Sequence, residues 1–149
     1  MATLRGGDKL HQKIHELLSL VHNPPKLRVG FLENATYPGG TPVAMVAAIQ
    51  DFGAPRAGIP PRPFFRNMIA AKSGEWPDAI AGLLRENGMN AVAALNVAGQ
   101  RIAGQLQESI TNTNSPPLAA STIARKGHSK PLVSTGRMLN SISHEVKTT

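Results

Sequence analysis

The stretch Asn90–Thr111, NAVAALNVAGQRIAGQLQESIT, decides the fold that this sequence can adopt. Its apolar side chains recur at steps of three and four residues, which is the stripe of a helix with one buried face. The stripe contains Ala91, Leu95, Ala98, Ile102 and Ile110, with Val92 and Leu106 beside it. Asn90 is a suitable N-cap, so we predict a core helix roughly 30 Å long, at about 1.5 Å per residue.

Two glycines, Gly99 and Gly104, lie inside this helix. Glycine is about 1 kcal/mol less favourable than alanine in a helix interior, so its use twice in a core helix needs a reason in packing. We expect both glycines to let another segment of backbone approach the helix closely.

Composition limits the class of protein. The chain has 149 residues, and we expect a single domain over 1–149. It contains no cysteine, which excludes disulfides, cysteine-type zinc sites and thiol nucleophiles. No apolar run approaches the roughly 20 residues that span a bilayer, and no signal peptide is evident, so we expect no membrane partner and a cytoplasm-like site of synthesis. The net charge of +7 predicts an anionic partner, either nucleic acid or an acidic protein surface.

Two segments outside the central helix alternate as half-buried strands do. In Lys26–Leu32 the apolar residues Leu27, Val29 and Phe31 share one face, and Ile142–Lys147 alternates in the same way. The two segments match in length and type, so we predict that they pair. The predicted fold class is therefore α+β, with a small antiparallel sheet packed on the long central helix, shorter helices and long loops.

Shorter helices are predicted on both sides of the sequence midpoint. An N-terminal region, 1–25, carries an amphipathic helix over Asp8–Val21 that Asn23-Pro24-Pro25 ends. Thr41 is predicted to cap a helix from Pro42 to Phe52, which Gly53 ends. That helix is apolar on every side, so we expect the domain or a neighbouring subunit to cover it all round. Further helices are expected after Phe64 and over 76–84, separated from the previous one by a proline-rich loop at 54–63.

The segment 112–134 is predicted to be a long loop that docks on a partner and is partly disordered in the free monomer. Within it, 118–125 is expected to form one or two helical turns, and Ser134-Thr135-Gly136 is expected to start another helix. Arg125, Lys126 and Lys130 form a basic tip around Gly127, which is suited to phosphates or to an acidic protein and is equally typical of a solvated loop. No aromatic residue interleaves with these charges, so we favour an acidic protein over DNA.

The sequence offers little that could carry catalysis. His11 and His15 stand four residues apart, as in zinc-binding helices, with His22 near the same face, but Gln12 occupies the position of the glutamate that a metalloprotease needs. We therefore interpret the histidines as a solvated polar face and predict no metal site. No nucleotide-binding, hydrolase or calcium motif is present, and the nine acidic residues are scattered. We predict that the protein is not an enzyme and has no cofactor.

Two sets of short motifs follow one another along the chain. The first set is Val29-Gly30-Phe31, YPGGTPVA at 37–44, Asp51-Phe52-Gly53 and IPPRPF at 59–64. The second set is Pro116-Pro117-Leu118, TIARKG at 122–127, KPLV at 130–133 and TGRMLNSI at 135–142. In this order the motifs resemble those of the tail-completion proteins of long-tailed bacteriophages, which join head and tail at the neck. The resemblance covers the chain from about Leu27 to Val146, and the histidine-bearing helix lies outside it.

The resemblance implies a structural virion protein without catalytic residues. Such a protein is a subunit of a homo-oligomeric ring, expected to be a hexamer, at the head-proximal end of the tail. Its neighbours would be a tail terminator or tail tube protein and a head connector or stopper protein, and its lumen could touch DNA. The alternative from another class is a small basic nucleic-acid-binding protein. The residues expected to contact a neighbour or partner are Arg62, Phe64, Phe65, Arg66, Arg125, Lys126, Lys130 and Arg137.

Overall fold

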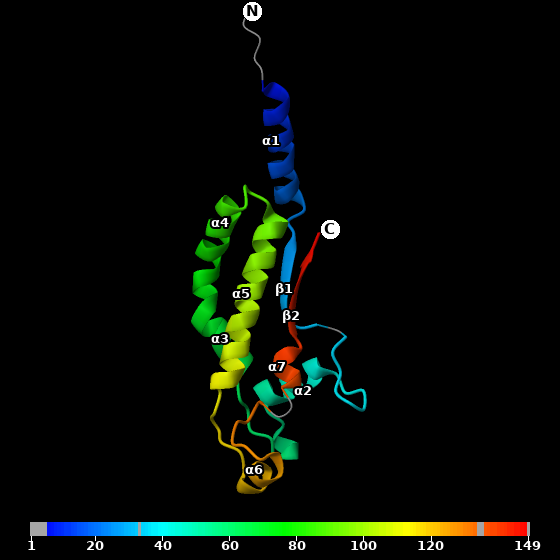
Figure 1. Cartoon of the computed structure of the whole chain (residues 1–149), viewed down its shortest axis with the longest axis vertical. Coiled ribbons are helices and arrows are strands. Elements are labelled where there is room, and N and C mark those ends of the chain that lie inside the picture. Colours follow the sequence, from blue (N-terminus) through cyan, green and yellow to red (C-terminus); the bar gives the residue numbers. More distant parts are fainter. Residues whose placement is uncertain (1–5, 33, 134–135, 149) are drawn as a thin grey trace, which may run out of the picture.

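The structure, a computed structural model, describes residues 6–32, 34–133 and 136–148 (Figure 1). Its elements are α1 (Gly7–His22), β1 (Lys26–Phe31), α2 (Val43–Phe52), η1 (Pro55–Ala57), α3 (Phe64–Lys72), η2 (Ser73–Glu75), α4 (Trp76–Glu86), α5 (Ala91–Asn112), α6 (Ala120–Lys126), α7 (Arg137–Asn140) and β2 (Ile142–Lys147). The predicted α+β class, with a two-stranded antiparallel sheet on a long central helix, is confirmed.

Helix α5 is the centre of the molecule. It packs against α3 and α4 on one side and against both strands on the other (Figure 1). The molecule is elongated, with α1 projecting beyond one end of this layered body and α6 lying at the opposite end. The side chains of α2, α3, α5, α7 and β2 form the main core, and a smaller cluster joins α4 to the first half of α5.

The strand pair forms as the alternation predicts. The register runs from Lys26 opposite Lys147 to Phe31 opposite Ile142. The β1 face bearing Leu27 and Val29 packs on the core, while Arg28 on the other face forms an exposed ion pair with Glu145 at 2.9 Å. An isolated two-stranded ribbon is marginal in water, so burial of one face against α5 is what stabilises it.

Helix α5 begins where the sequence predicts. The Asn90 side chain accepts a hydrogen bond from the Ala93 N–H at 3.0 Å, as an N-cap does. The buried stripe is shifted slightly from the predicted one: Ala98, Ile102 and Ile110 are buried, but Leu106, placed beside the stripe, is completely buried. The predicted stripe members Ala91 and Leu95 are half-buried, because the stripe's centre passes through Ala94.

The two glycines of α5 differ in what lies against them. A Cβ on Gly99 would stand 2.5 Å from Cδ2 of His144 on β2, so only glycine lets the His144 side chain lie this close to the helix. The close approach predicted at Gly99 is therefore made by a side chain of β2. At Gly104 nothing lies within 4 Å of the missing Cβ, and the residue is exposed. The prediction of a close approach at Gly104 is wrong.

Helix α2 departs from the sequence prediction at its start and in its burial. It begins at Val43 with Pro42 at the N-cap and no side-chain cap, so the prediction that Thr41 caps the helix is wrong, whereas Gly53 ends it as expected. Its own domain buries one face of the helix, at Val43, Ala47 and Asp51, and the elements in contact with α2 include β1, α3 and α7. Met45 is 56% exposed and Phe52 is 65% exposed, so the domain does not cover the helix all round.

The long connection from α5 to α7 contains the short helix that was expected within it, α6. Gly127 ends α6 in the left-handed conformation, at φ 77°. Ser134 and Thr135, predicted to start the following helix, lie outside the described residues, and Gly136 is the N-cap of α7.

Candidate functional site

The residues predicted to contact a partner fall into two groups. Arg62 and Phe64 are buried, at 4% and 1% exposure, so the structure removes both from the surface. Phe64 belongs to the main core, where its ring meets Phe31 and Phe65 edge-on. Both side chains lie inside the fold of the single chain, after the proline-rich loop, and the expected contact of these two residues with a partner stays a prediction. Phe65 and Lys126 are half-buried, and the remaining four residues, Arg66, Arg125, Lys130 and Arg137, are exposed.

Arg66 is held by Asp51, a residue that sequence reasoning did not single out. The buried Asp51 carboxylate accepts hydrogen bonds from the Phe65 N–H at 2.9 Å and from Arg66 Nε at 2.7 Å. It thereby caps the start of α3 from another helix, which offsets the helix dipole and the unsatisfied N–H groups there. The signal was present in the sequence, since Val43, Ala47 and Asp51 follow each other at four-residue steps on the buried face of α2.

Arg62 ties the loop before α6 to the body of the molecule. Its Nε donates to the Pro116 carbonyl at 2.9 Å, its Nη2 to the Pro117 carbonyl at 3.4 Å, and its Nη1 to Gln50 Oε1 at 3.4 Å. All three acceptors are neutral, so this buried guanidinium has no carboxylate to balance its charge in the hydrogen bonds described. Burial lowers the pKa of Arg62 for this reason.

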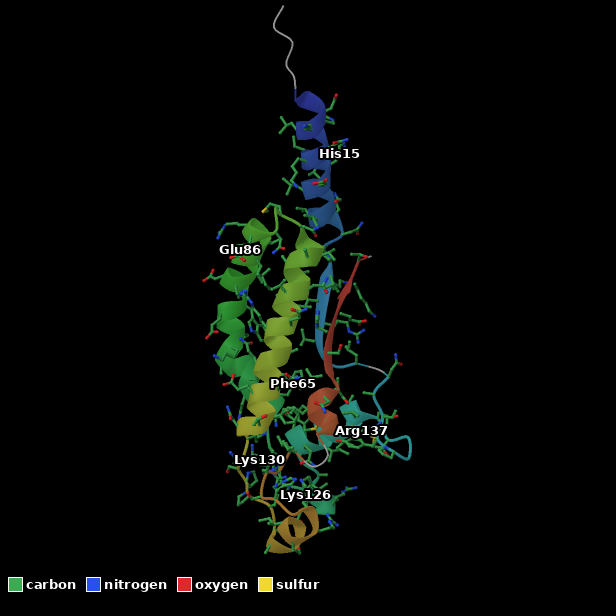
Figure 2. All side chains as sticks on the ribbon, in the orientation of Figure 1. His15, Phe65, Glu86, Lys126, Lys130 and Arg137 are labelled. Carbon is green, nitrogen blue, oxygen red and sulfur yellow. The ribbon has the colours of Figure 1, made fainter. Side chains whose placement is uncertain are left out.

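The basic tip lies next to Arg62. Lys126 Nζ donates to the carbonyls of Lys130, at 3.4 Å, and Pro131, at 3.1 Å, which folds the tip back on itself. Burial lowers the pKa of Lys126, and the positive charges of Arg62 and Arg125 lower it further. Figure 2 shows Lys126 and Lys130 toward the end of the molecule opposite His15 on α1.

Two recesses open between the basic tip and the body. The larger, the Arg62 recess, has a volume of about 980 Å³ and lies between the loop 58–62 and the segment 117–131. The smaller, the Arg137 recess, measures about 140 Å³ and is lined by Tyr37, Val46 and Arg137 among others. Gln50, Lys126 and Pro131 line both, so the two recesses adjoin. Within the described chain, Arg62, Arg125, Lys126 and Arg137 line them and no Asp or Glu does.

Arg137 lines the smaller recess and also joins two elements of the fold. Its Nε donates to the Thr36 carbonyl at 2.8 Å, which links α7 to the turn before α2. Burial raises the pKa of Tyr37, an effect that the charge of Arg137 partly opposes. Tyr37 is therefore a neutral hydroxyl at physiological pH, placed beside two cations.

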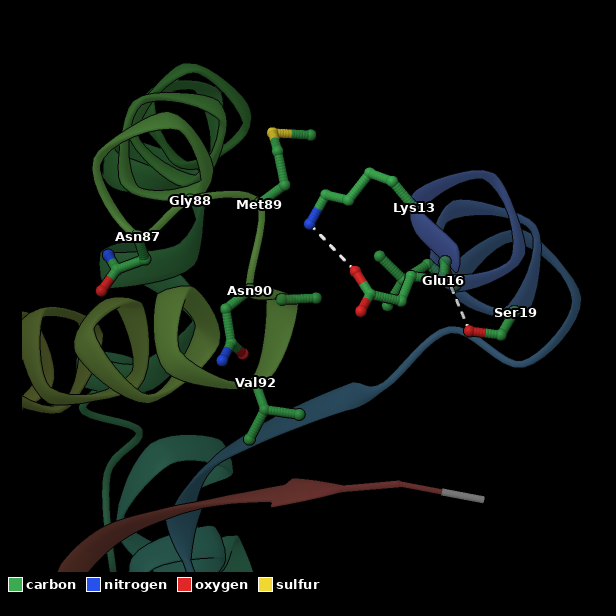
Figure 3. Close-up of a pocket in the computed structure, with 10 residues that line it drawn as sticks. Lys13, Glu16, Ser19, Asn87, Gly88, Met89, Asn90 and Val92 are labelled. Atoms are coloured by element: carbon green, nitrogen blue, oxygen red, sulfur yellow. Dashed lines mark hydrogen bonds and ion pairs between the residues drawn. The ribbon is translucent and has the colours of Figure 1, made fainter. Parts of the chain in front are cut away.

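The second exposed surface is the apolar stripe of α1. No residue of α1 is buried, and Leu10, Ile14, Leu17, Leu18 and Val21 are all at least 40% exposed. The side of α1 that faces the body carries Lys13, Glu16 and Ser19, across a cavity of about 460 Å³ from the turn between α4 and α5 (Figure 3). At 100° per residue, the apolar stripe lies on the side of the helix away from that turn.

The histidines of α1 remain solvated. The rings of His11 and His15 meet edge-on with centroids 5.5 Å apart, and His22 Nδ1 lies 3.0 Å from the Leu18 carbonyl. Among the described residues, no group of three or more His, Cys, Asp or Glu lies close enough together to hold a metal ion. None of the helices in the described ranges is both long and apolar enough to cross a bilayer.

Comparison with protein-family models, with curated proteins and with solved structures finds no match to this chain. The two surfaces are therefore interpreted from their own geometry: an apolar helix face without a covering layer at one end, and a cationic pair of recesses at the other.

Proposed function

We propose that this protein is a structural subunit of a phage virion, which completes the head-proximal end of the tail and joins it to the head or neck as part of a homo-oligomeric ring. The single observation that carries the proposal is α1. A helix with five exposed large apolar side chains and no buried residue is incomplete as part of a monomer, because such patches mark interaction surfaces.

The stripe of α1 favours another copy of this chain as its neighbour. Leu10, Ile14, Leu17 and Val21 follow at steps of four, three and four, which is the seam of a helix that packs lengthwise on another helix. The seam spans only about two heptads, too few to hold two chains together alone. In a closed ring, the α1 stripe of each subunit would pack on a different surface of the next subunit. Each subunit then has two neighbours and cannot leave without breaking two contacts.

The segment 112–134 is proposed to dock on the next protein along the tail axis, either the tail terminator or tube protein or the head connector or stopper. Its basic tip lies at the end of the molecule away from α1 (Figures 1 and 2). It also holds His128, whose buried Nδ1 has no hydrogen-bond partner among the described residues. Hydrogen exchange should show protection of 112–134 rising on assembly; equal protection in the free and assembled protein would contradict the docking role.

The ring itself is tested by sedimentation velocity and negative-stain imaging of the purified protein. We expect closed rings, with six subunits as the expected number, and we expect the pair Ile14→Glu and Leu17→Glu to leave a folded monomer. The matched control is Gln12→Glu with Ser19→Glu, which adds the same charge on the opposite face of α1 and should still assemble. Monomers from the unaltered chain, in the presence and absence of virion proteins, would end the proposal.

A second candidate, a small basic nucleic-acid-binding protein, is favoured by the cationic recesses. Its signature is affinity for duplex DNA that falls steeply with salt, by roughly 0.9 log unit in Kd per log unit of salt for each phosphate contact. A neck subunit should instead retain little DNA affinity at moderate salt while its assembly persists.

A further inference from the structure

The two adjoining recesses bring positive charges together and leave them unbalanced. Arg62, Arg125, Lys126 and Arg137 line a continuous surface on which, of the described residues, none is an acid. Burial of a charge without a counter-charge is unfavourable, and here a buried guanidinium and a partly buried ammonium lie close enough to repel each other. An anion placed between them would relieve that repulsion.

The polar atoms around the recesses include hydrogen-bonding groups that would orient such an anion. A guanidinium has five N–H donors, and the hydrogen bonds recorded for Arg62 use its Nε and one donor on each terminal nitrogen. The Tyr37 hydroxyl and the Gln50 side chain, which line the recesses beside the cations, add neutral polar groups. The remaining lining of the larger recess includes Pro60, Leu118 and Pro131 together with the polar residue Thr122.

We propose that the recesses bind carboxylate side chains of an extended acidic polypeptide segment from a partner protein. Two adjoining recesses of different size suit a slender chain that presents acids at intervals, one to Arg125 and Lys126 and the next to Arg137. Arg62, which is 4% exposed, adds its positive charge from beneath this surface and does not need to touch the acid directly. Single-stranded nucleic acid needs aromatic platforms, and the one aromatic residue lining these recesses, among those described, is the half-buried Tyr37.

This site does not depend on ring formation, because all of its residues belong to one chain. The inference adds to the proposed function the chemistry of the partner that the basic end would meet. A monomeric variant, such as the Ile14→Glu and Leu17→Glu pair, should bind the acidic segment as well as the ring does, so the two proposals can fail separately.

The test is fluorescence anisotropy with a fluorescein-labelled hexaglutamate peptide, which stays extended at neutral pH because its charges repel. Hexaglutamine with the same label and a thymidine oligonucleotide of equal charge complete the set of probes. We expect binding of hexaglutamate and no binding of hexaglutamine. Arg125→Gln, at an exposed position, and Lys126→Gln should each weaken hexaglutamate binding roughly tenfold, the loss of one charge-assisted hydrogen bond.

The matched control is Arg85→Gln in the last turn of α4, which removes the same charge outside the residues that line the recesses. It should leave the affinity within about twofold of the unaltered protein, as expected for a screened surface charge. An equal loss in Arg85→Gln would show that net charge alone attracts the peptide and would overturn the site. Tighter binding of the oligonucleotide, lost in the Lys126→Gln and Arg125→Gln variants, would assign the recesses to phosphate and also overturn the proposal. Circular dichroism of each variant verifies that the fold persists.

Discussion

Helices α5 and α1 were both predicted from apolar residues at steps of three and four, yet they meet opposite surroundings. In α5 the stripe is buried against α3, α4 and both strands, and Leu106 and Ile110 are almost completely inaccessible. In α1 the same kind of stripe faces solvent, and Val21 is 77% exposed. Periodicity therefore predicts which face of a helix will be covered, but not whether the covering layer belongs to the same chain.

The difference in burial between the two helices is tested most directly by replacing one leucine in each of them with alanine. Leu106→Ala should lower the free energy of unfolding by about 2–5 kcal/mol, because it leaves a cavity in the main core. Leu17→Ala should change it by less than about 0.5 kcal/mol, since the side chain is exposed and alanine is an equally good helix former. Urea denaturation at a concentration where the protein is monomeric measures both. A loss above about 1 kcal/mol for Leu17→Ala would mean that the domain itself covers α1.

A second prediction compares the effects on stability of replacing the two glycines of α5. Gly99→Ala should destabilise the fold by about 1–3 kcal/mol, because the new methyl group would overlap the His144 ring and push β2 away. Gly104→Ala is the matched control, since the added methyl group meets nothing within 4 Å. It should stabilise the protein by about 0.5–1 kcal/mol through helix propensity. Thermal unfolding of both variants would separate these opposite signs, and a destabilised Gly104→Ala would contradict the open environment at that position.

The smallest expected effect concerns how the two helices begin. The side chain of Asn90 caps α5, whereas α1 begins after Gly6 without any side-chain cap. Asn90→Ala should cost about 1 kcal/mol of stability. Asn96→Ala, the same substitution at an exposed position inside α5, should be neutral or slightly stabilising because alanine favours the helix. Equal losses for the two variants, by urea denaturation, would show that the cap contributes nothing.

Much of the fold follows from local pattern. The start of α5, both strands and their pairing, and the end of α2 at Gly53 all came from period, caps and turn residues. These features depend on neighbours within a few residues of each other, and that information is visible in a sequence. The start of α2 was missed because Pro42 serves as the N-cap itself rather than as the first helical residue.

The candidate site was predicted only in part. The basic tip was visible as a run of charge, but the role of Arg62 depends on carbonyls 54 and 55 residues further along the chain. No local pattern reports which loops will meet, so Arg62 and Phe64 were placed on the surface although both are buried. Gln50 and Tyr37 were missed for the same reason, because they become part of the recesses only once α7 and the segment 117–131 are folded over them.

Asp51 has a consequence for the exposed ring beside it. By fixing Arg66, it places the guanidinium carbon 4.5 Å from the centre of the Phe52 ring, which is itself 65% exposed. The guanidinium, which Asp51 holds in place, thus lies over the face of the exposed ring, and this cation–π contact favours one position of the Phe52 side chain. A partner that packed on the Phe52 ring would therefore meet a side chain that is already held in place, and ordering it would cost less free energy than ordering a mobile side chain.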